Sequence, residues 1–208
     1  MGYYDLDDIL ADSAEIPCKF LHDIPGLGYL ENNPGGTIHV NTQLKLPLWL
    51  ARVLAIIDAS SASDDVGNAD IFNTEQQFTP FLNMLTPETF TNKVINAIKT
   101  DPISLDLHSI NPYFYALAIK WIELFSDKDL AEIVSDLLLQ RSQVINAHAN
   151  STTISYNNNS NSTSSTGNNN TTNNNHALFT LTLDEFEKKI YKEANDSYKD
   201  IKKWIYQY

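Results

Sequence analysis

The sequence predicts an α+β protein that is mainly α, with a small β-rich domain at residues 1–46 and a helical domain at residues 47–208. Short, often alternating apolar runs bounded by proline, glycine and asparagine fill the first part, which is typical of a small sheet. Longer segments with apolar residues every three or four positions fill the second part and predict a bundle of about five helices. Hydrophobic residues make up 42% of the 208-residue chain, which is enough for a packed core.

The first domain begins with an acidic segment and continues as short strands. Residues 1–31 carry seven acids against one lysine. The run YYDLDDILA favours a short helix with Tyr4, Ile9 and Leu10 on its apolar side. The runs EIPCKF, GLGYLE, TIHVN and QLKLPL then predict the small sheet.

The helical domain opens at Pro47, because proline suits the first position of a helix and the apolar run LWLARVLAII follows it. A second helix is expected to begin at Thr86-Pro87-Glu88. It ends before Asp101-Pro102, since proline disfavours helical geometry in the residue ahead of it. The run PYFYALAIKWIELF predicts a third helix that is apolar on almost every side.

Capping patterns mark the starts of two further helices. Ser126 with Asp129 is a variant of the capping box and precedes a broad apolar stripe. Thr182 with Glu185 forms a capping box ahead of a C-terminal amphipathic helix, which we interpret as a docking helix.

Two polar stretches interrupt the helical domain. The run DASSASDDVGNAD predicts an exposed loop. Residues 150–176 are mostly serine, threonine and asparagine, with almost nothing to bury, so they predict a disordered insert that serves as a passive spacer.

The stretch DIPGLGYLENNPGG, at residues 23–36, raises the question of a phosphate-binding loop. A dinucleotide fingerprint needs a third glycine at position 31, where the chain has Glu31, and it needs a helix directly afterwards. We therefore expect Gly26 and Gly28 to let the chain bend and approach a neighbouring strand, and Pro34-Gly35-Gly36 to turn it back.

No motif for catalysis, a cofactor or a metal emerges from the sequence. The five histidines are scattered, and Asp106 with His108 is better interpreted as a histidine held by a neighbouring carboxylate than as a metal site. Cys18 beside Lys19 fits a small buried strand residue better than an activated thiol. The sequence therefore predicts a protein that is not an enzyme and has no cofactor.

The charge and hydropathy of the chain restrict its partners. A net charge of −12 argues against the basic face that duplex DNA requires. No apolar run approaches the length of about 18 residues that a membrane span needs, and no signal peptide is apparent. We expect a soluble intracellular protein that binds neither membranes nor specific nucleic-acid sequences.

Aromatic residues are concentrated in a few helical elements. About five helices, some apolar on every side, have more apolar surface than a small bundle hides, which favours an obligate partner surface. The concentrated aromatic residues are Trp49, Tyr113, Phe114, Tyr115, Trp121, Phe125 and Trp204.

Several segments together resemble the Psf-three subunits of the eukaryotic GINS complex. They are YYDLDDIL, DIPGLGYLENNP, LPLWLARVLA, NAIKTDPISLDLHSINPYF, AIKWIELFS, LLLQR and LDEFEKKIYKEANDSYKDIKKW. They occur in the family's order and cover nearly the whole chain, apart from the two polar stretches.

The resemblance implies a non-catalytic subunit of a nuclear heterotetramer. Its partners would be the other three GINS subunits, the Psf-two type being the nearest. The tetramer would join the minichromosome-maintenance (MCM) hexamer and Cdc-forty-five in the replicative DNA helicase, for initiation and elongation of replication. The alternative is a stand-alone protein-binding adaptor of the same fold that acts outside replication.

The resemblance also implies roles of fold and contact for particular residues. Pro47–Ala51 would join the two domains, Trp121 and Phe125 would lie in the helical core or at a subunit seam, and Tyr4–Leu10 would form an acidic segment. The candidate partner-interface or domain-junction residues are Tyr4, Asp5, Leu10, Leu48, Trp49, Trp121, Phe125 and Trp204.

Overall fold

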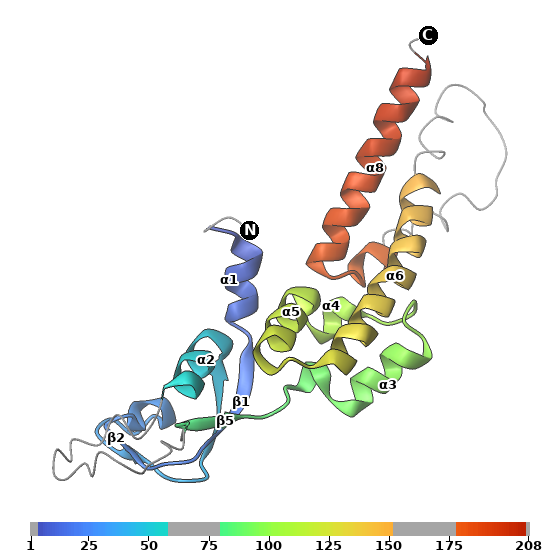
Figure 1. Cartoon of the computed structure of the whole chain (residues 1–208). Coiled ribbons are helices and arrows are strands. Elements are labelled where there is room, and N and C mark those ends of the chain that lie inside the picture. Colours follow the sequence, from blue (N-terminus) through green and yellow to red (C-terminus); the bar gives the residue numbers. More distant parts are fainter. Residues whose placement is uncertain (1–3, 58–79, 152–177, 207–208) are drawn as a thin grey trace, which may run out of the picture. The chain divides into compact units, whose positions relative to one another are not determined.

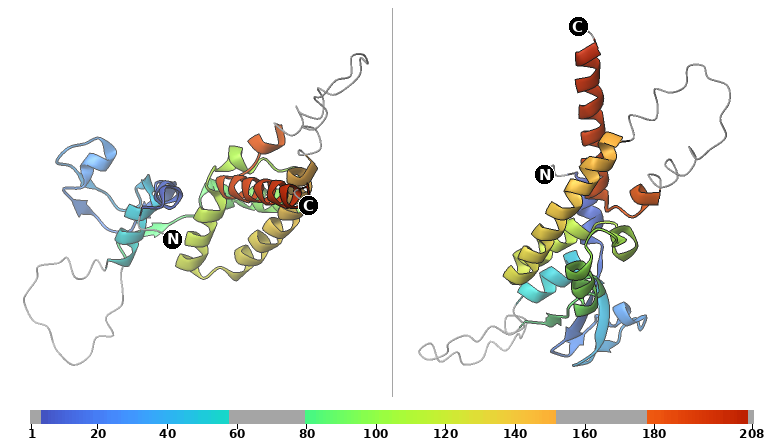
Figure 2. Two further views of the ribbon diagram at one scale, coloured as in Figure 1. Left: turned by 90° about the horizontal axis from the view of Figure 1, so that it is seen from above. Right: turned by 90° about the vertical axis from the view of Figure 1, so that its right-hand side faces the viewer.

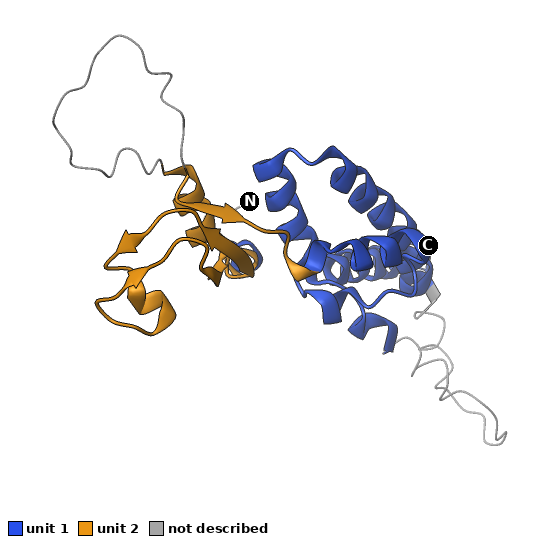
Figure 3. Ribbon diagram, turned by 90° about the horizontal axis from the view of Figure 1, so that it is seen from below, with its two compact units in different colours: residues 1–8, 89–208 blue, residues 9–88 orange. Residues whose placement is uncertain are grey.

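The computed structural model describes residues 4–57, 80–151 and 178–206 (Figure 1). The chain forms two compact units, one of residues 9–88 and one of residues 1–8 with 89–208 (Figure 3). The first unit contains the sheets and the second contains the helical bundle, so the predicted α+β fold class is confirmed.

The β unit is built around a three-stranded antiparallel sheet. Its strands are β1 (Glu15–Phe20), β4 (Gln43–Pro47) and β5 (Leu82–Met84), in the order β4-β1-β5. Cys18 of the central strand lies opposite Leu44 on one side and Met84 on the other. Alternate residues of β1, namely Ile16, Cys18 and Phe20, are fully buried, as a strand with one face on a core requires.

Helix α2 (Leu48–Ile56) belongs to the same unit. It starts where β4 ends, with Pro47 just outside the helix, and the Leu48 N–H donates to the carbonyl of Ala14 at 2.9 Å. Leu48 and Ala51 are buried. The structure thus divides the chain at residues 88 and 89, whereas we expected the division at 46 and 47; β5 pairs with β1 and brings the later residues into this unit.

A second, two-stranded sheet of β2 (Ile24–Pro25) and β3 (Thr37–Ile38) flanks the glycine-rich stretch. The segment GLGYLE was predicted as a strand, and that prediction is wrong: Gly28–Glu31 form the 3-10 helix η1. A Cβ on Gly28 would lie 2.5 Å from the Asn33 carbonyl oxygen, so this tight turn accepts only glycine. The close approach is made to the loop itself rather than to a neighbouring strand.

The helical unit contains most of the helices. They are α3 (Asn92–Thr100), α4 (Leu107–Ile110), α5 (Phe114–Phe125), α6 (Lys128–Ser151) and α8 (Glu185–Tyr206), with the 3-10 turn η3 (Glu88–Phe90) leading into α3. The first part of α1 (Leu6–Asp12) also belongs to this unit. Helices α6 and α8 run side by side (Figures 1 and 2).

Both predicted capping boxes are shifted from where the sequence placed them. Ser126 ends α5 in the left-handed conformation, and the Asp127 carboxylate caps α6 by accepting the Leu130 N–H at 3.1 Å. Asp184, not Thr182, begins α8, since the Asp184 N–H donates to Glu187 at 3.3 Å. Asp184 with Glu187 forms the reciprocal pattern two residues beyond Thr182, whereas Asp127 caps α6 without a reciprocal acid, because Leu130 stands three residues on.

Two predictions fall on residues outside those that the structure describes. The loop predicted after Ala59 lies there, as does nearly all of the insert predicted at 150–176. The first two residues of that insert, Asn150 and Ser151, complete α6 instead. Within the described parts of the chain, no helix is long and apolar enough to cross a membrane.

Candidate partner-binding surfaces and the polar cluster beneath them

A buried ion pair connects two helices of the helical unit. Arg141 of α6 and Glu187 of α8 are 2% and 0% exposed, and they form a bidentate pair with Nε–Oε1 at 2.6 Å and Nη2–Oε2 at 2.9 Å. Planar guanidinium and carboxylate groups match in this geometry, which gives directional as well as electrostatic stabilisation. The pair therefore fixes α8 against α6 near its first turn.

The same arginine also fixes the connection between α3 and α4. Its Nη1 donates to the carbonyl oxygens of Pro102, Ile103 and Leu105 at 3.0, 3.3 and 2.8 Å. Buried carbonyls need donors, and a guanidinium supplies several from one side chain. Arg141 thus donates hydrogen bonds both to the carbonyl oxygens of this connection and to the Glu187 carboxylate.

Tyr115 of α5 completes this polar cluster. Its hydroxyl donates to Glu187 Oε1 at 2.8 Å, and burial together with the neighbouring carboxylate raises the pKa of the tyrosine far above its ordinary value. The hydroxyl therefore stays protonated and serves as a donor. Figure 1 shows the three helices α5, α6 and α8 that supply the cluster.

Asp184 lies at the point where α5 and α8 both begin. Its carboxylate accepts the N–H of Phe114 at 3.0 Å and the N–H of Phe186 at 3.4 Å, so one side chain caps two helices. Burial is the main cause that raises its pKa to about 7, with Glu187 adding to the rise, while the two N–H donors oppose it.

Exposed apolar residues form a stripe on α2 in the β unit. Trp49, Val53 and Ile56 are 55, 51 and 60% exposed, and their spacing of four and three residues places them on one helix face. The opposite face carries the buried Leu48 and Ala51. This helix is therefore apolar on two sides and uses only one of them within its unit.

Helix α8 carries a second stripe in the helical unit. Its residues after Lys188 include none that is buried, although the helix continues for several turns. Ile201, Trp204 and Ile205 are all more than half exposed. Contiguous exposed apolar surface of this kind marks an interaction site.

The structure separates the eight predicted site residues into two groups. Leu48 and Trp121 are core residues; Trp121 is 6% exposed and contacts Phe90 and Phe125, whose ring centroids lie 6.0 and 4.4 Å away. The others are accessible: Tyr4, Leu10, Trp49, Phe125 and Trp204 are exposed and Asp5 is half-buried.

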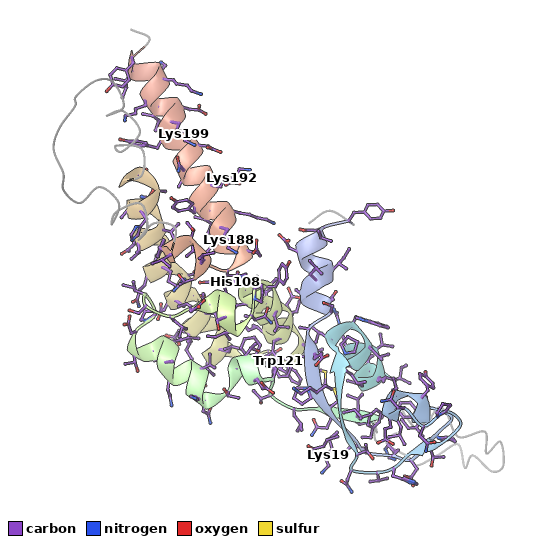
Figure 4. All side chains as sticks on the ribbon, turned by 180° about the vertical axis from the view of Figure 1, so that it is seen from behind. Lys19, His108, Trp121, Lys188, Lys192 and Lys199 are labelled. Carbon is purple, nitrogen blue, oxygen red and sulfur yellow. The ribbon has the colours of Figure 1, made fainter. Side chains whose placement is uncertain are left out.

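The sequence motifs that were rejected as chemical sites have structural roles. Burial raises the pKa of the Cys18 thiol to about 11, which makes it unreactive at neutral pH. Asp106 caps α4 through the Ser109 N–H, and His108 lies 3.4 Å from Lys188 rather than against a carboxylate (Figure 4). In the described residues, no group of three or more potential ligands is placed to hold a metal.

Sequence reasoning missed the polar cluster and, apart from Trp49, the α2 stripe. Arg141 and Glu187 sit among other polar residues on long helices, where charge normally faces solvent, and 46 residues separate them. The sequence could have predicted the α2 stripe, since the run LWLARVLAII is apolar on more faces than packing against one core requires.

A helical bundle with a small β unit, both exposing apolar helix faces, defines a class of protein that works by association. Comparison with known families identifies which one. Residues 4–56 match the PSF3 N-terminal domain, and residues 89–206 match the helical bundle domain of GINS complex proteins. The chain belongs to the PSF3 family of GINS complex proteins.

Individual relatives agree with this assignment along the whole chain. The DNA replication complex GINS protein PSF3 of Saccharomyces cerevisiae is 54% identical, covering 100% of both chains. The protein of that name from Candida glabrata is 49% identical, covering 99% of both chains. The Neurospora crassa protein is 32% identical, covering 99% of this chain and 97% of its own length.

Proposed function

We propose that this chain is a non-catalytic structural subunit of a nuclear GINS heterotetramer. That tetramer joins the MCM hexamer and Cdc-forty-five to form the replicative DNA helicase, and it serves both initiation and elongation of chromosomal replication. The partners of this chain are the other three GINS subunits, with the Psf-two type nearest. Similarity to the PSF3 relatives over the full chain supports the replication role.

The observation that carries the structural part of this proposal is the exposed stripe on α8. Helix α8 packs along α6, but of its 22 residues only Glu187 is buried, so much of its apolar surface stays uncovered within its own unit. Helices of this length owe most of their stability in water to packing of an apolar face. A sister subunit that covers Ile201, Trp204 and Ile205 supplies that packing.

Co-expression with the three sister subunits tests the proposal. A structural subunit is expected to aggregate or to remain partly unfolded alone, and to be recovered in soluble form at equal stoichiometry with its partners. Size-exclusion chromatography with mass determination measures both. A cooperatively folding monomer that ignores the three sisters contradicts the proposal and favours the stand-alone adaptor.

The helicase part needs its own experiment. The purified tetramer, mixed with MCM hexamer and Cdc-forty-five, is expected to form one complex and to raise unwinding of a forked DNA. The tetramer alone is expected to hydrolyse no ATP. ATP hydrolysis by the tetramer, or unwinding by the hexamer that is indifferent to it, contradicts this part.

A further inference from the structure

An apolar groove runs between α5 and α6 in the helical unit. It has a volume of about 340 Å³, and its lining comes from the start of the chain, from α5 and α6, and from the first turn of α8. The lining includes three small side chains, Ala116 of α5 and Ala131 and Ser135 of α6, which leave space between the two helices. Larger apolar residues border this trough, namely Ile119, Ile122, Val134, Leu138 and Phe186.

The groove exposes large apolar side chains that the helical unit leaves uncovered. Ile119 lies in the middle of α5 and is 47% exposed, and Phe186 in the first turn of α8 is also 47% exposed. Tyr115 also lines the groove, is buried, and donates its hydroxyl to Glu187 at 2.8 Å. The buried polar cluster thus holds Tyr115, one residue of the groove lining, in place. A groove with a fixed lining favours a rigid occupant.

The rim of the groove is acidic. Four partly exposed acids line it, namely Asp5, Asp7, Asp8 and Glu185, while Asp184 in the same lining is buried and caps two helices. Three lysines pair with members of this set: Lys189 with Asp7, Lys120 with Asp8 and Lys188 with Glu185. Four partly exposed acids against three lysines leave the rim acidic, and Asp5, which accepts the Asp7 N–H, also attracts the Lys189 ammonium.

We infer that this groove binds an amphipathic helix of a sister subunit, with apolar residues at three- and four-residue spacing and lysines or arginines beside them. The inference rests on the proposed function, since it names the chemistry of the partner. Apolar anchors fill the trough in the manner of other helix-in-groove complexes, and the flanking cations face the acidic rim. Recognition by an acidic rim sets register and excludes acidic helices.

Photo-cross-linking in the co-expressed tetramer tests which segment occupies the groove. A benzophenone amino acid replaces Ile119, and in a control chain it replaces Leu139, which is 60% exposed on α6 but lies outside the groove. The adduct at position 119 is expected on a sister-subunit helix with lysine or arginine within one turn. An adduct on a loop or on an acidic helix, no adduct at all, or the same adduct from position 139 overturns the inference.

Two substitutions, one in the apolar lining and one on the acidic rim, test whether the groove contributes to binding of the sister subunits. Ile119→Glu is expected to weaken binding of the sister subunits more than tenfold, whereas the matched change Leu139→Glu leaves it nearly unaltered. Asp5→Lys is expected to weaken binding roughly fivefold at low salt, and the effect shrinks at high salt because the contact is a screened surface interaction. The same reversal at Asp136, an exposed acid of α6 outside the groove, serves as control.

These outcomes separate the groove from the proposed function. If the unaltered chain fails to co-purify with the three sisters, the proposed function itself is wrong. If the unaltered chain co-purifies and Ile119→Glu and Asp5→Lys behave as their controls, only the groove inference is wrong. Circular dichroism of each complex shows whether Ile119→Glu has kept its helices. Where it has not, the cross-link from position 119 decides whether a sister-subunit helix occupies the groove.

Discussion

Arg141 connects α6 both to α8 and to the segment between α3 and α4. It binds Glu187 of α8 and three carbonyls between α3 and α4. Removing one partner of a buried ion pair leaves the other charged and without compensation, and that loss exceeds the value of the pair itself. We therefore expect the helical unit to be sensitive to loss of this arginine.

Arg141→Ala is expected to destabilise the region by about 3–5 kcal/mol, because Glu187 stays buried and three carbonyls lose their donor. Replacing both partners, as Arg141→Met with Glu187→Leu, is expected to cost less than Arg141→Ala. Hydrogen exchange of the first turns of α8, followed by mass spectrometry in the co-purified complex, measures the opening free energy. A double variant that is as unstable as the single one would show that the carbonyls, not the ion pair, dominate.

Asp184 makes the helical unit sensitive to pH. Burial raises its pKa to about 7 from an ordinary value of 3.8, so the native state holds a proton that the unfolded chain releases. The stability from this group is complete below about pH 4 and is lost as the pH rises through 7. The stability of the chain relative to Asp184→Asn, whose amide does not titrate, is therefore expected to fall between pH 5 and pH 8.

The difference in thermal midpoint between the unaltered complex and the Asp184→Asn complex measures this effect at each pH. Taking the difference removes the contribution of the groups that titrate identically in both. The asparagine keeps one oxygen for the Phe114 N–H, so the cap on α5 survives in part. A difference that stays constant from pH 5 to pH 8 would contradict the raised pKa.

At the scale of secondary-structure elements, α8 behaves as two halves. The first turn is fixed by Asp184 and Glu187, and the later residues expose one apolar stripe. Ile201, Trp204 and Ile205 are all more than half exposed, and changes at exposed positions away from caps and buried networks usually cost little stability. We therefore expect the first turn of α8 to matter for folding of the helical unit and the exposed stripe to matter for binding.

Trp204→Ala is expected to change the stability of the helical unit by less than about 0.5 kcal/mol. It is expected to weaken binding of the sister subunits by about 2 kcal/mol or more, since tryptophans at interface centres carry much of the affinity. Sedimentation of the purified complex across a dilution series measures the binding. Glu193→Ala, an exposed change on the same helix, is the control, and equal losses in both variants would rule out a localised binding stripe.

Elements with a strong local signal were predictable from the sequence, whereas those that depend on distant residues were not. The alternating run EIPCKF gives β1 with its expected burial, and Asp101-Pro102 ends α3 at Thr100 as predicted. Strand β5 has three residues and is defined by its pairing with β1, more than 60 positions earlier. GLGYLE looks like a strand but closes as a turn, since the Gly28 N–H donates to the Gly36 carbonyl, a partner that lies outside the run itself.

The candidate site was predictable in kind but not in detail. Aromatic excess on a few helices predicted exposed apolar surface, and Trp49 and Trp204 lie on such surface. Trp121 and Leu48 are apolar too but are buried, since periodicity alone does not tell which face of an all-round apolar helix meets the core. The acidic rim of the groove combines residues at the start of the chain with others more than 170 positions later, a proximity that no local pattern encodes.

At the scale of the whole molecule, the two units have separate cores. The core of the β unit includes Cys18, Phe20 and Leu82, and that of the helical unit includes Leu107, Phe114 and Leu137. Independent cores allow independent opening, because local unfolding follows cooperative units rather than the chain as a whole. Cys18 reports on one of them, since its buried thiol reacts only when the β unit opens.

Leu82→Ala and Leu107→Ala therefore form a matched pair. Both leucines are at most 1% exposed, and each change is expected to cost about 2–5 kcal/mol through a lost side chain and a cavity. Leu82→Ala loosens β5 against β1 and is expected to accelerate labelling of Cys18 by iodoacetamide at least tenfold, with helical circular dichroism retained. Leu107→Ala is expected to lower the helical signal on heating and to leave Cys18 protected. If Leu107→Ala exposes the thiol as much as Leu82→Ala does, the units unfold together, and β5 and β1 no longer explain the boundary at residues 88 and 89.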